Sequence, residues 1–239
     1  VHKTTGGAPV HALDGVSITF EEKGMVFLLG KSGSGKSTLL NLCGGLDSPD
    51  SGEIIIKGRS SKDFSQSDFD SYRNTFIGFV FQEYNILNEF SVEDNIALAL
   101  ELQGKNKDKA RVQEILKQVE LENFAKRKPN TLSGGQRKRI ALARTLVSPA
   151  EVLILDEPTN HLDSDMVIWL EDYIKKFRGE LIMVTHDRYF LDNVTNRIVE
   201  LDGGKLYGYD TNYSGFLELK TQREEMERAT EAKRANILR

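Results

Sequence analysis

Short apolar runs alternate with amphipathic stretches at both ends of the chain, and a helical pattern fills the middle. In the first part, apolar runs predict strands at 16–20, 25–29, 53–57 and 77–82, with a helix at 38–44. The run 25–29 is continuously apolar and ends in Gly30, which is typical of a strand buried on both faces. This part of the chain therefore predicts a mixed α/β layer.

The hydrophobic period changes after Ser91. Ser91 and Asp94 have the spacing of a helix cap, and the run 95–102 follows them. A second helix is indicated by four apolar residues at i, i+3, i+4 and i+7, namely Val112, Ile115, Leu116 and Val119. We expect residues 88–136 to form a helical subdomain inserted into one α/β core made of residues 1–87 and 137–215.

Strands and helices alternate again after Pro129. The patterns predict helices at 134–146 and 166–177 and strands at 151–155, 181–185 and 198–201. Such alternation favours a largely parallel sheet covered by helices on both faces, within a single domain of 239 residues. Residues 216–239 are expected to form a charged helix with few apolar anchors, and the polar stretch 60–71 is interpreted as a loop.

Composition narrows the class of protein. At 39% hydrophobic and 28% charged residues, the chain has the make-up of an ordinary globular domain. Its longest apolar runs are about five residues, far below the ~20 that span a bilayer, so we expect no direct membrane insertion. The net charge of −4 does not favour a nucleic-acid partner, and the single Cys43 suits a reducing, cytoplasmic environment.

A glycine-rich segment carries the clearest chemistry. Residues 30–37 read GKSGSGKS, which fits the pattern G-x-x-x-x-G-K-[ST] between a buried strand and a helix. In such a loop, backbone N–H groups surround phosphate oxygens and the next helix points its positive end at them. Lys36 would reach the β- and γ-phosphates, and the Ser37 hydroxyl would bind Mg²⁺. The candidate nucleotide-binding residues of this phosphate loop are Gly30, Lys31, Ser32, Gly33, Ser34, Gly35, Lys36, Ser37 and Thr38.

Two acids end the strand predicted at 151–155. Asp156 is placed to hold a metal, and Glu157 to polarise a water molecule. The alternative interpretation is a strand that ends in two solvated acids. The phosphate loop upstream favours the catalytic interpretation.

A second glycine-opened helix start lies at Leu132-Ser133-Gly134-Gly135-Gln136. Ser133 and Gln136 have the spacing of a capping box, which indicates a second helix N-terminus of the kind that binds phosphate. At these residues the sequence resembles the ATP-binding-cassette (ABC) ATPases, in which LSGGQ is the signature. Three further family elements follow in order: Gln82 matches the Q-loop, residues 160–163 the D-loop, and His186 the switch histidine.

The resemblance implies an α/β P-loop NTPase fold, with a mixed or parallel sheet and an inserted helical subdomain, that hydrolyses ATP with Mg²⁺. It also implies that two cassettes pack head to tail, so that ATP on one phosphate loop is closed by the signature of a second copy or of another ABC domain. The residues acting in trans would be Ser133, Gly134, Gly135, Gln136 and Asp163.

The resemblance also assigns roles within one subunit. Glu157 would be the general base, and His186 would contact the γ-phosphate or the attacking water. Gln82 would serve catalysis, and the metal would be held by Ser37, Gln82 and Asp156. The position of the adenine-stacking aromatic falls on or near His2.

Two parts of the chain resemble different branches of the family. Residues 10–131 resemble ATPase subunits of macrolide- or antimicrobial-peptide-type permeases, whereas residues 132–239 resemble ABC-F proteins, which are soluble ATPases acting on the ribosome. Three uses remain open: the motor of a transporter, a ribosome-associated factor, or a nucleotide-gated dimerisation module. A hybrid of the first two, with uncoupled ATPase activity, is a further interpretation. The location is expected to be cytoplasmic, or peripheral to the inner membrane where a permease is the partner.

The segment 126–144 contains basic residues and no acid. It is interpreted either as a patch facing nucleotide phosphates or ribosomal RNA, or as a solvated helix face. The basic residues are Lys126, Arg127, Lys128, Arg137, Lys138, Arg139 and Arg144.

Overall fold

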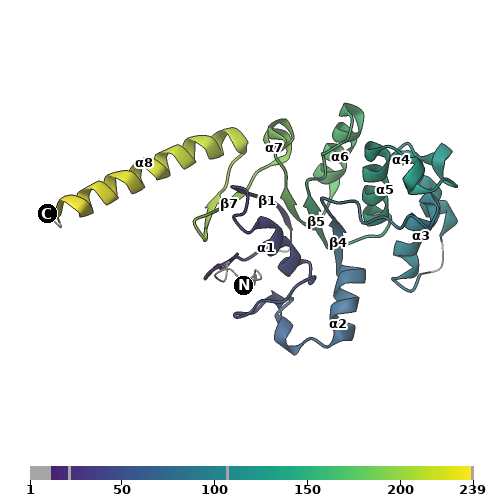
Figure 1. Ribbon diagram of the computed structural model, residues 1–239, viewed down its shortest axis with the longest axis horizontal. Coiled ribbons are helices and arrows are strands. Elements are labelled where there is room, and N and C mark those ends of the chain that lie inside the picture. The colour runs from purple at the N-terminus through teal and green to yellow at the C-terminus, as the bar shows by residue number, and fades with distance from the viewer. Residues whose placement is uncertain (1–11, 21–22, 106–107, 238–239) are drawn as a thin grey trace, which may run out of the picture.

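A six-stranded sheet forms the centre of the molecule (Figure 1). The computed structural model describes residues 12–20, 23–105 and 108–237. The strands are β1 (Gly24–Gly30), β4 (Ile77–Val80), β5 (Val152–Asp156), β6 (Glu180–Val184), β7 (Ile198–Asp202) and β8 (Lys205–Tyr209). Their order is β4-β5-β6-β1-β7-β8, and all neighbours are parallel except β7 and β8. The carboxyl ends of β1, β5 and β6 therefore meet at one edge, where open α/β sheets bind ligands.

Helices cover both faces of this sheet, and alternate side chains of a strand pack into the cores on opposite faces. Val26 and Leu28 of β1 pack on the face that carries Leu40, whereas Phe27 points to the opposite core. Leu40 belongs to α1 (Lys36–Cys43), and the opposite face carries α5 (Gly134–Leu146), α6 (Ser164–Lys176) and α7 (Arg188–Val194). This double covering explains why the central strands β1, β5 and β6 are almost continuously apolar. The prediction of a mostly parallel, P-loop type α/β sheet is confirmed.

The middle of the chain is helical, as predicted. The helices α3 (Val92–Glu101) and α4 (Lys109–Gln118) are capped by Ser91 and Asp108 and pack with α5 at one end of the molecule (Figure 1). Short elements complete this end and the β1–β4 connection: β2 (Ile55–Ile56), β3 (Arg59–Ser60), α2 (Gln66–Ser71) and the turns Ser61–Asp63, Tyr72–Phe76, Glu122–Phe124 and Pro129–Thr131. Within the described ranges, none of the helices combines the length and apolar character that crossing a bilayer requires.

Three sequence predictions about local structure are wrong. Residues 16–20 form no strand, because no strand pairs with them among the described residues, although their alternating apolar side chains do pack on the α1 face. The strand expected at 53–57 is reduced to the two residues of β2. The polar stretch 60–71 contains α2, which Ser65 and Asp68 begin with a capping box. The patterns also missed the short α7 and the edge strand β8.

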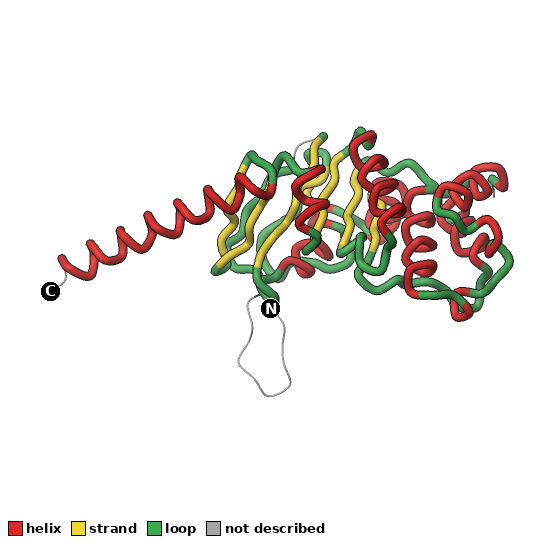
Figure 2. The backbone as a smooth tube through the Cα atoms, turned by 90° about the horizontal axis from the view of Figure 1, so that it is seen from above, coloured by secondary structure: helices red, strands yellow, loops and turns green. Residues whose placement is uncertain are grey.

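The last helix, α8 (Tyr213–Ile237), leaves the domain as a long projection (Figures 1 and 2). It begins three residues before the predicted start and is better anchored than its charged sequence indicates. Phe216 is buried against Tyr209, with ring centroids 5.1 Å apart. Lys220 and Arg223 both pair with Glu200, a buried acid of β7. The first three turns of α8 therefore belong to the packed domain.

Removing the Phe216 anchor should destabilise the fold. Phe216 is 4% exposed, so Phe216→Ala should lower the free energy of unfolding by about 3 kcal/mol or more, because it opens a cavity in the core. Leu219→Ala is the matched control. Leu219 lies in the same helix but is 42% exposed, so this substitution should lower the free energy of unfolding by less than about 0.5 kcal/mol. Urea unfolding measures both, and equal effects would contradict the docking of α8.

Candidate functional site

The phosphate loop joins β1 to α1 and depends on glycine. Gly33 and Gly35 have φ values of +76° and +101°. A Cβ atom on Gly35 would lie 2.3 Å from the carbonyl oxygen of Ala12. Because a side chain at Gly35 would collide with the backbone of Ala12, this loop conformation requires glycine at that position. The start of α1 is thereby held at the carboxyl end of β1.

Two polar side chains of the loop point into it. The Lys36 Nζ donates to the carbonyl oxygens of Gly30 (2.7 Å) and Lys31 (2.9 Å). Partial burial lowers the pKa of Lys36, and attraction to Glu157 and Asp156 opposes this. The Ser34 hydroxyl is buried with no hydrogen-bond partner among the described residues. The interior of the loop thus contains the Lys36 ammonium and an unsatisfied hydroxyl, which suits an anionic ligand.

The acid predicted as general base lies at the end of β5. Glu157 is only 5% exposed and has a left-handed backbone with φ +47°. Its Oε2 accepts the backbone N–H of His186 at 3.3 Å, and its Oε1 lies 3.5 Å from the His186 Nε2. Burial raises the pKa of Glu157, while His186 opposes this. The carboxylate is therefore oriented by β6 and held more basic than an ordinary glutamate.

One basic residue of the segment 126–144 lies in the core, which neither interpretation of that segment predicted. Lys138 of α5 is 0% exposed and donates to the carbonyl oxygen of Phe81 at 3.1 Å. Burial lowers its pKa to about 8, against the attraction of Asp156 and Glu157. Burial also raises the pKa of Asp156, and Lys138 and Lys36 are the cations that lower it. A signal was present, because Lys138 lies three and four residues before the apolar Ala141 and Leu142 of α5.

The signature segment begins α5 and is closely packed. Ser133 and Gln136 form the predicted capping box. A Cβ on Gly135 would lie 2.7 Å from the carbonyl oxygen of His161, and one on Gly134 would lie 3.2 Å from the Tyr84 hydroxyl. The approach of the helix start to the D-loop therefore requires glycine at Gly135, whereas at Gly134 the Tyr84 side chain would have to shift slightly to admit a Cβ.

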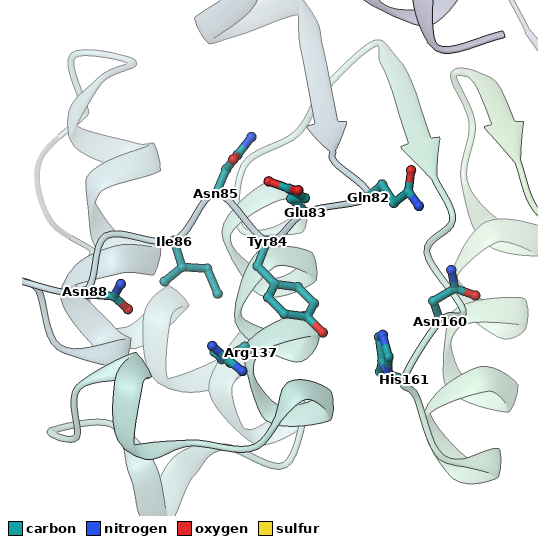
Figure 3. Close-up of a pocket in the computed structure, with 9 residues that line it drawn as sticks. All are labelled: Gln82, Glu83, Tyr84, Asn85, Ile86, Asn88, Arg137, Asn160 and His161. Carbon is teal, nitrogen blue, oxygen red and sulfur yellow. The ribbon is translucent and has the colours of Figure 1, made fainter. Parts of the chain in front are cut away.

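A cleft of about 600 Å³ lies beside this helix start (Figure 3). Gln82 and Asn160 lie at one side, and Tyr84 lies between Arg137 and His161. The Arg137 guanidinium is 5.4 Å from the Tyr84 ring centroid, and the ring of His161 meets that of Tyr84 edge to face at 6.4 Å. The cleft thus joins the Q-loop, the signature helix and the D-loop of one chain.

The predicted site residues fall into two groups. The phosphate loop, Asp156, Glu157 and His186 converge on the carboxyl ends of β1, β5 and β6. Lys36 and His186 line a cavity of about 510 Å³ that α8 also borders. Gln82 lines the other cleft, beside the signature segment. Asp163 caps α6 by accepting the N–H of Met166 and pairs with Arg139. His2 lies outside the described residues.

The basic segment 126–144 does not form a continuous free patch. Lys138 is buried, Arg139 pairs with Glu120 and Asp163, and Arg144 donates to the carbonyl oxygen of Asn85. These side chains hold α5 in place because carbonyls and acids of the same chain satisfy them.

Comparison with known families identifies the domain. The model of the ABC transporter family matches residues 13–160, and a second ABC transporter model, of an extension, matches residues 199–239. The chain belongs to the ABC transporter family of ATPases. The resemblance stated from the motifs is thereby confirmed.

Relatives of different kinds match most of the chain. The uncharacterized ABC transporter ATP-binding protein YfmR of Bacillus subtilis is 37% identical over 100% of this chain and 41% of its own length. The lipoprotein-releasing system ATP-binding protein LolD of Chromohalobacter salexigens is 38% identical over 84% of this chain and 87% of its own. The ATP-binding protein Uup of Buchnera aphidicola is 39% identical over 82% of this chain and 31% of its own.

A solved structure matches the fold. The ATP-binding cassette MJ0796, in a dimeric post-hydrolysis state bound to ADP and Pi, is 33% identical and has a TM-score of 0.78. The match covers 87% of this chain and 94% of that one. The chain spans about half or less of the length of several curated relatives, including the 41% of YfmR.

Lys36→Ala should abolish nucleotide binding. The substitution removes the ammonium that hydrogen-bonds inside the loop, and backbone N–H dipoles alone replace it poorly. Equilibrium titration with a fluorescent ATP analogue measures the loss, which we expect to exceed about a hundredfold in Kd. Lys62→Ala, on an exposed surface, controls for the lost charge. Unchanged affinity in the Lys36 variant would remove the loop from the site.

Proposed function

We propose that the chain binds Mg²⁺-ATP and hydrolyses its γ-phosphate in a head-to-tail dimer. The observation that carries this proposal is the buried Glu157, which is held by His186 at the sheet edge where the phosphate loop begins. A buried carboxylate with a raised pKa, next to a phosphate-binding loop, suits proton abstraction from water. The solved relative bound to ADP and Pi supports the same chemistry.

Each side chain of this group has a distinct task in the proposal. Lys36 exchanges its loop carbonyls for the β- and γ-phosphate oxygens. Glu157 accepts a proton from the attacking water. His186 is 78% exposed, so its ring can contact the γ-phosphate or that water while its backbone N–H keeps Glu157 in place. The remaining residues of the loop, 30–38, bind through their backbone N–H groups.

The proposed metal ligands fit Mg²⁺ by their chemistry. Ser37, Asp156 and Gln82 offer hydroxyl, carboxylate and amide oxygens, which are the hard donors that Mg²⁺ prefers beside substrate phosphates. When bound, Mg²⁺ would neutralise charge on the β- and γ-phosphates. Asp156 suits this role because burial raises its pKa and nearby cations oppose that rise, so a bound metal ion would further favour its ionised form.

The second half of the site would come from another subunit. Ser133 and Gln136 use their backbone N–H groups in the capping box at the start of α5. Gly134 and Gly135, at the first positions of the helix, would therefore offer their backbone N–H groups to a γ-phosphate presented from outside, and the Ser133 hydroxyl and Gln136 would border it. Asp163 would contribute at the same face. The solved neighbours are dimeric cassettes, which supports this arrangement.

Glu157→Gln should keep ATP bound but stop turnover, because an amide can still hydrogen-bond the water yet cannot take its proton. Bound ATP would then persist and hold two subunits together. Sedimentation with Mg²⁺ and ATP should show a dimer in this variant and not in Lys36→Ala, which serves as its control. A variant that remains monomeric at high concentration with ATP bound would contradict the composite site.

The relatives indicate what the ATPase is coupled to. We infer an energy-coupling subunit of a transporter, because the relatives include LolD and the macrolide export ATP-binding/permease protein MacB of Mannheimia succiniciproducens, 36% identical over 84% of this chain. The cleft at Gln82–Asn88, beside the proposed helical subdomain 88–136, would be the docking surface. The proposed boundary between the helical subdomain and the α/β core, after residue 136, lies inside α5, so α5 would connect the subdomain to the core.

A ribosome-associated role is the second candidate. The relatives include the ABC-F protein Uup, and the extension model covers α8, which lies in the half of the chain that resembles ABC-F proteins. A hybrid of both branches would keep basal turnover and respond to neither partner. Phosphate release measured with added ribosomes, and separately with permease-containing membranes, distinguishes the three cases. Localisation in the cytoplasm, or at the inner membrane through a permease, follows the partner.

A further inference from the structure

A fully buried lysine links the signature helix to the strand before Gln82. Lys138 is 0% exposed, so its ammonium cannot reach water along the side chain, as most lysines do. Its Nζ donates to the carbonyl oxygen of Phe81, the residue that directly precedes Gln82. Burying a charge is costly unless specific partners compensate it.

The compensating charges are the acids of the reaction centre. Asp156 and Glu157 are the carboxylates that attract Lys138. They follow one another at the end of β5, and β4, whose last residue is Val80, pairs with β5 in parallel. Lys138 therefore lies where three parts of the site come together: the start of α5, the entry to Gln82, and the acids of β5.

We propose that Lys138 is a positioning residue that holds Gln82 at a fixed place relative to Asp156 and Glu157. It does so through the hydrogen bond from its ammonium to the Phe81 carbonyl oxygen, while the negative charges of the two acids attract that ammonium. This inference rests on the proposed role of Gln82 in hydrolysis. Because Lys138 is on the helix that begins with the signature, the same contact relates the position of Gln82 to that of Ser133.

Lys138→Met tests the proposal, because methionine fills a similar volume without the ammonium. We expect kcat to fall about tenfold, while the Kd for ATP changes less than about threefold. ATP binding should survive because the ammonium proposed to bind the phosphates is that of Lys36, which lies in the phosphate loop and is unchanged in this variant.

Thr145→Val is the matched control. Thr145 is also on α5 and donates to a β4 carbonyl, that of Phe79 at 3.0 Å, but it carries no charge. Loss of this bond should leave kcat within about twofold. If Thr145→Val slows turnover as much as Lys138→Met does, the effect is one of general helix–strand packing, and the proposal is overturned.

A double-mutant cycle with Gln82→Ala decides whether Lys138 acts through Gln82. We expect the double variant to be no slower than the slower single variant, because both changes remove the same positioned group. Multiplied defects would show independent action and overturn the proposal. If Gln82→Ala lowers kcat but Lys138→Met leaves kcat normal, the proposed role of Lys138 is overturned and that of Gln82 stands. If Gln82→Ala leaves kcat normal, the proposed role of Gln82 is refuted, and the inference about Lys138 fails with it.

Discussion

The site depends on keeping charged groups buried at the carboxyl ends of parallel strands. Such burial is unfavourable unless each charge finds a partner. Glu157 has the ring and backbone N–H of His186, and Asp156 has the attraction of Lys36 and Lys138. The parallel order β5-β6-β1 brings these groups to one edge. Because these opposite charges and hydrogen-bonding groups stabilise one another, the side chains of the site are held in position before any ligand binds.

The same principle explains how the last helix is held. Glu200 is buried in β7, and Lys220 and Arg223 of α8 supply its counter-charges. Arg223 also lies 3.6 Å over the ring of Tyr207 and pairs with Asp202. Since Asp202 ends β7 next to the phosphate loop, where it lies 4.0 Å from Lys31, the base of α8 is packed close to the nucleotide site.

Much of the fold and of the candidate site could be predicted from short-range patterns. The phosphate loop, the acids of β5 and the capped start of α5 all depend on local spacing, and α5 was predicted with its observed bounds. The strand at 16–20 was wrong because strand formation requires a partner that local alternation does not reveal. The burial of Lys138 and of Glu200 was not predicted, because the opposite charges that compensate them lie far away in the sequence. The short α7 and β8 were missed because few residues define them.

The central claim is that one active site is built from two chains, and mixing two inactive variants tests it most directly. Lys36→Ala lacks a working phosphate loop, and Ser133→Arg lacks a working signature, so each alone should fail to hydrolyse ATP. In an equal mixture, half of the dimers would be mixed and would contain one intact site, so phosphate release should return to about a quarter of the normal rate. Full activity of Ser133→Arg alone, or no recovery in mixtures shown to contain mixed dimers, would contradict the account.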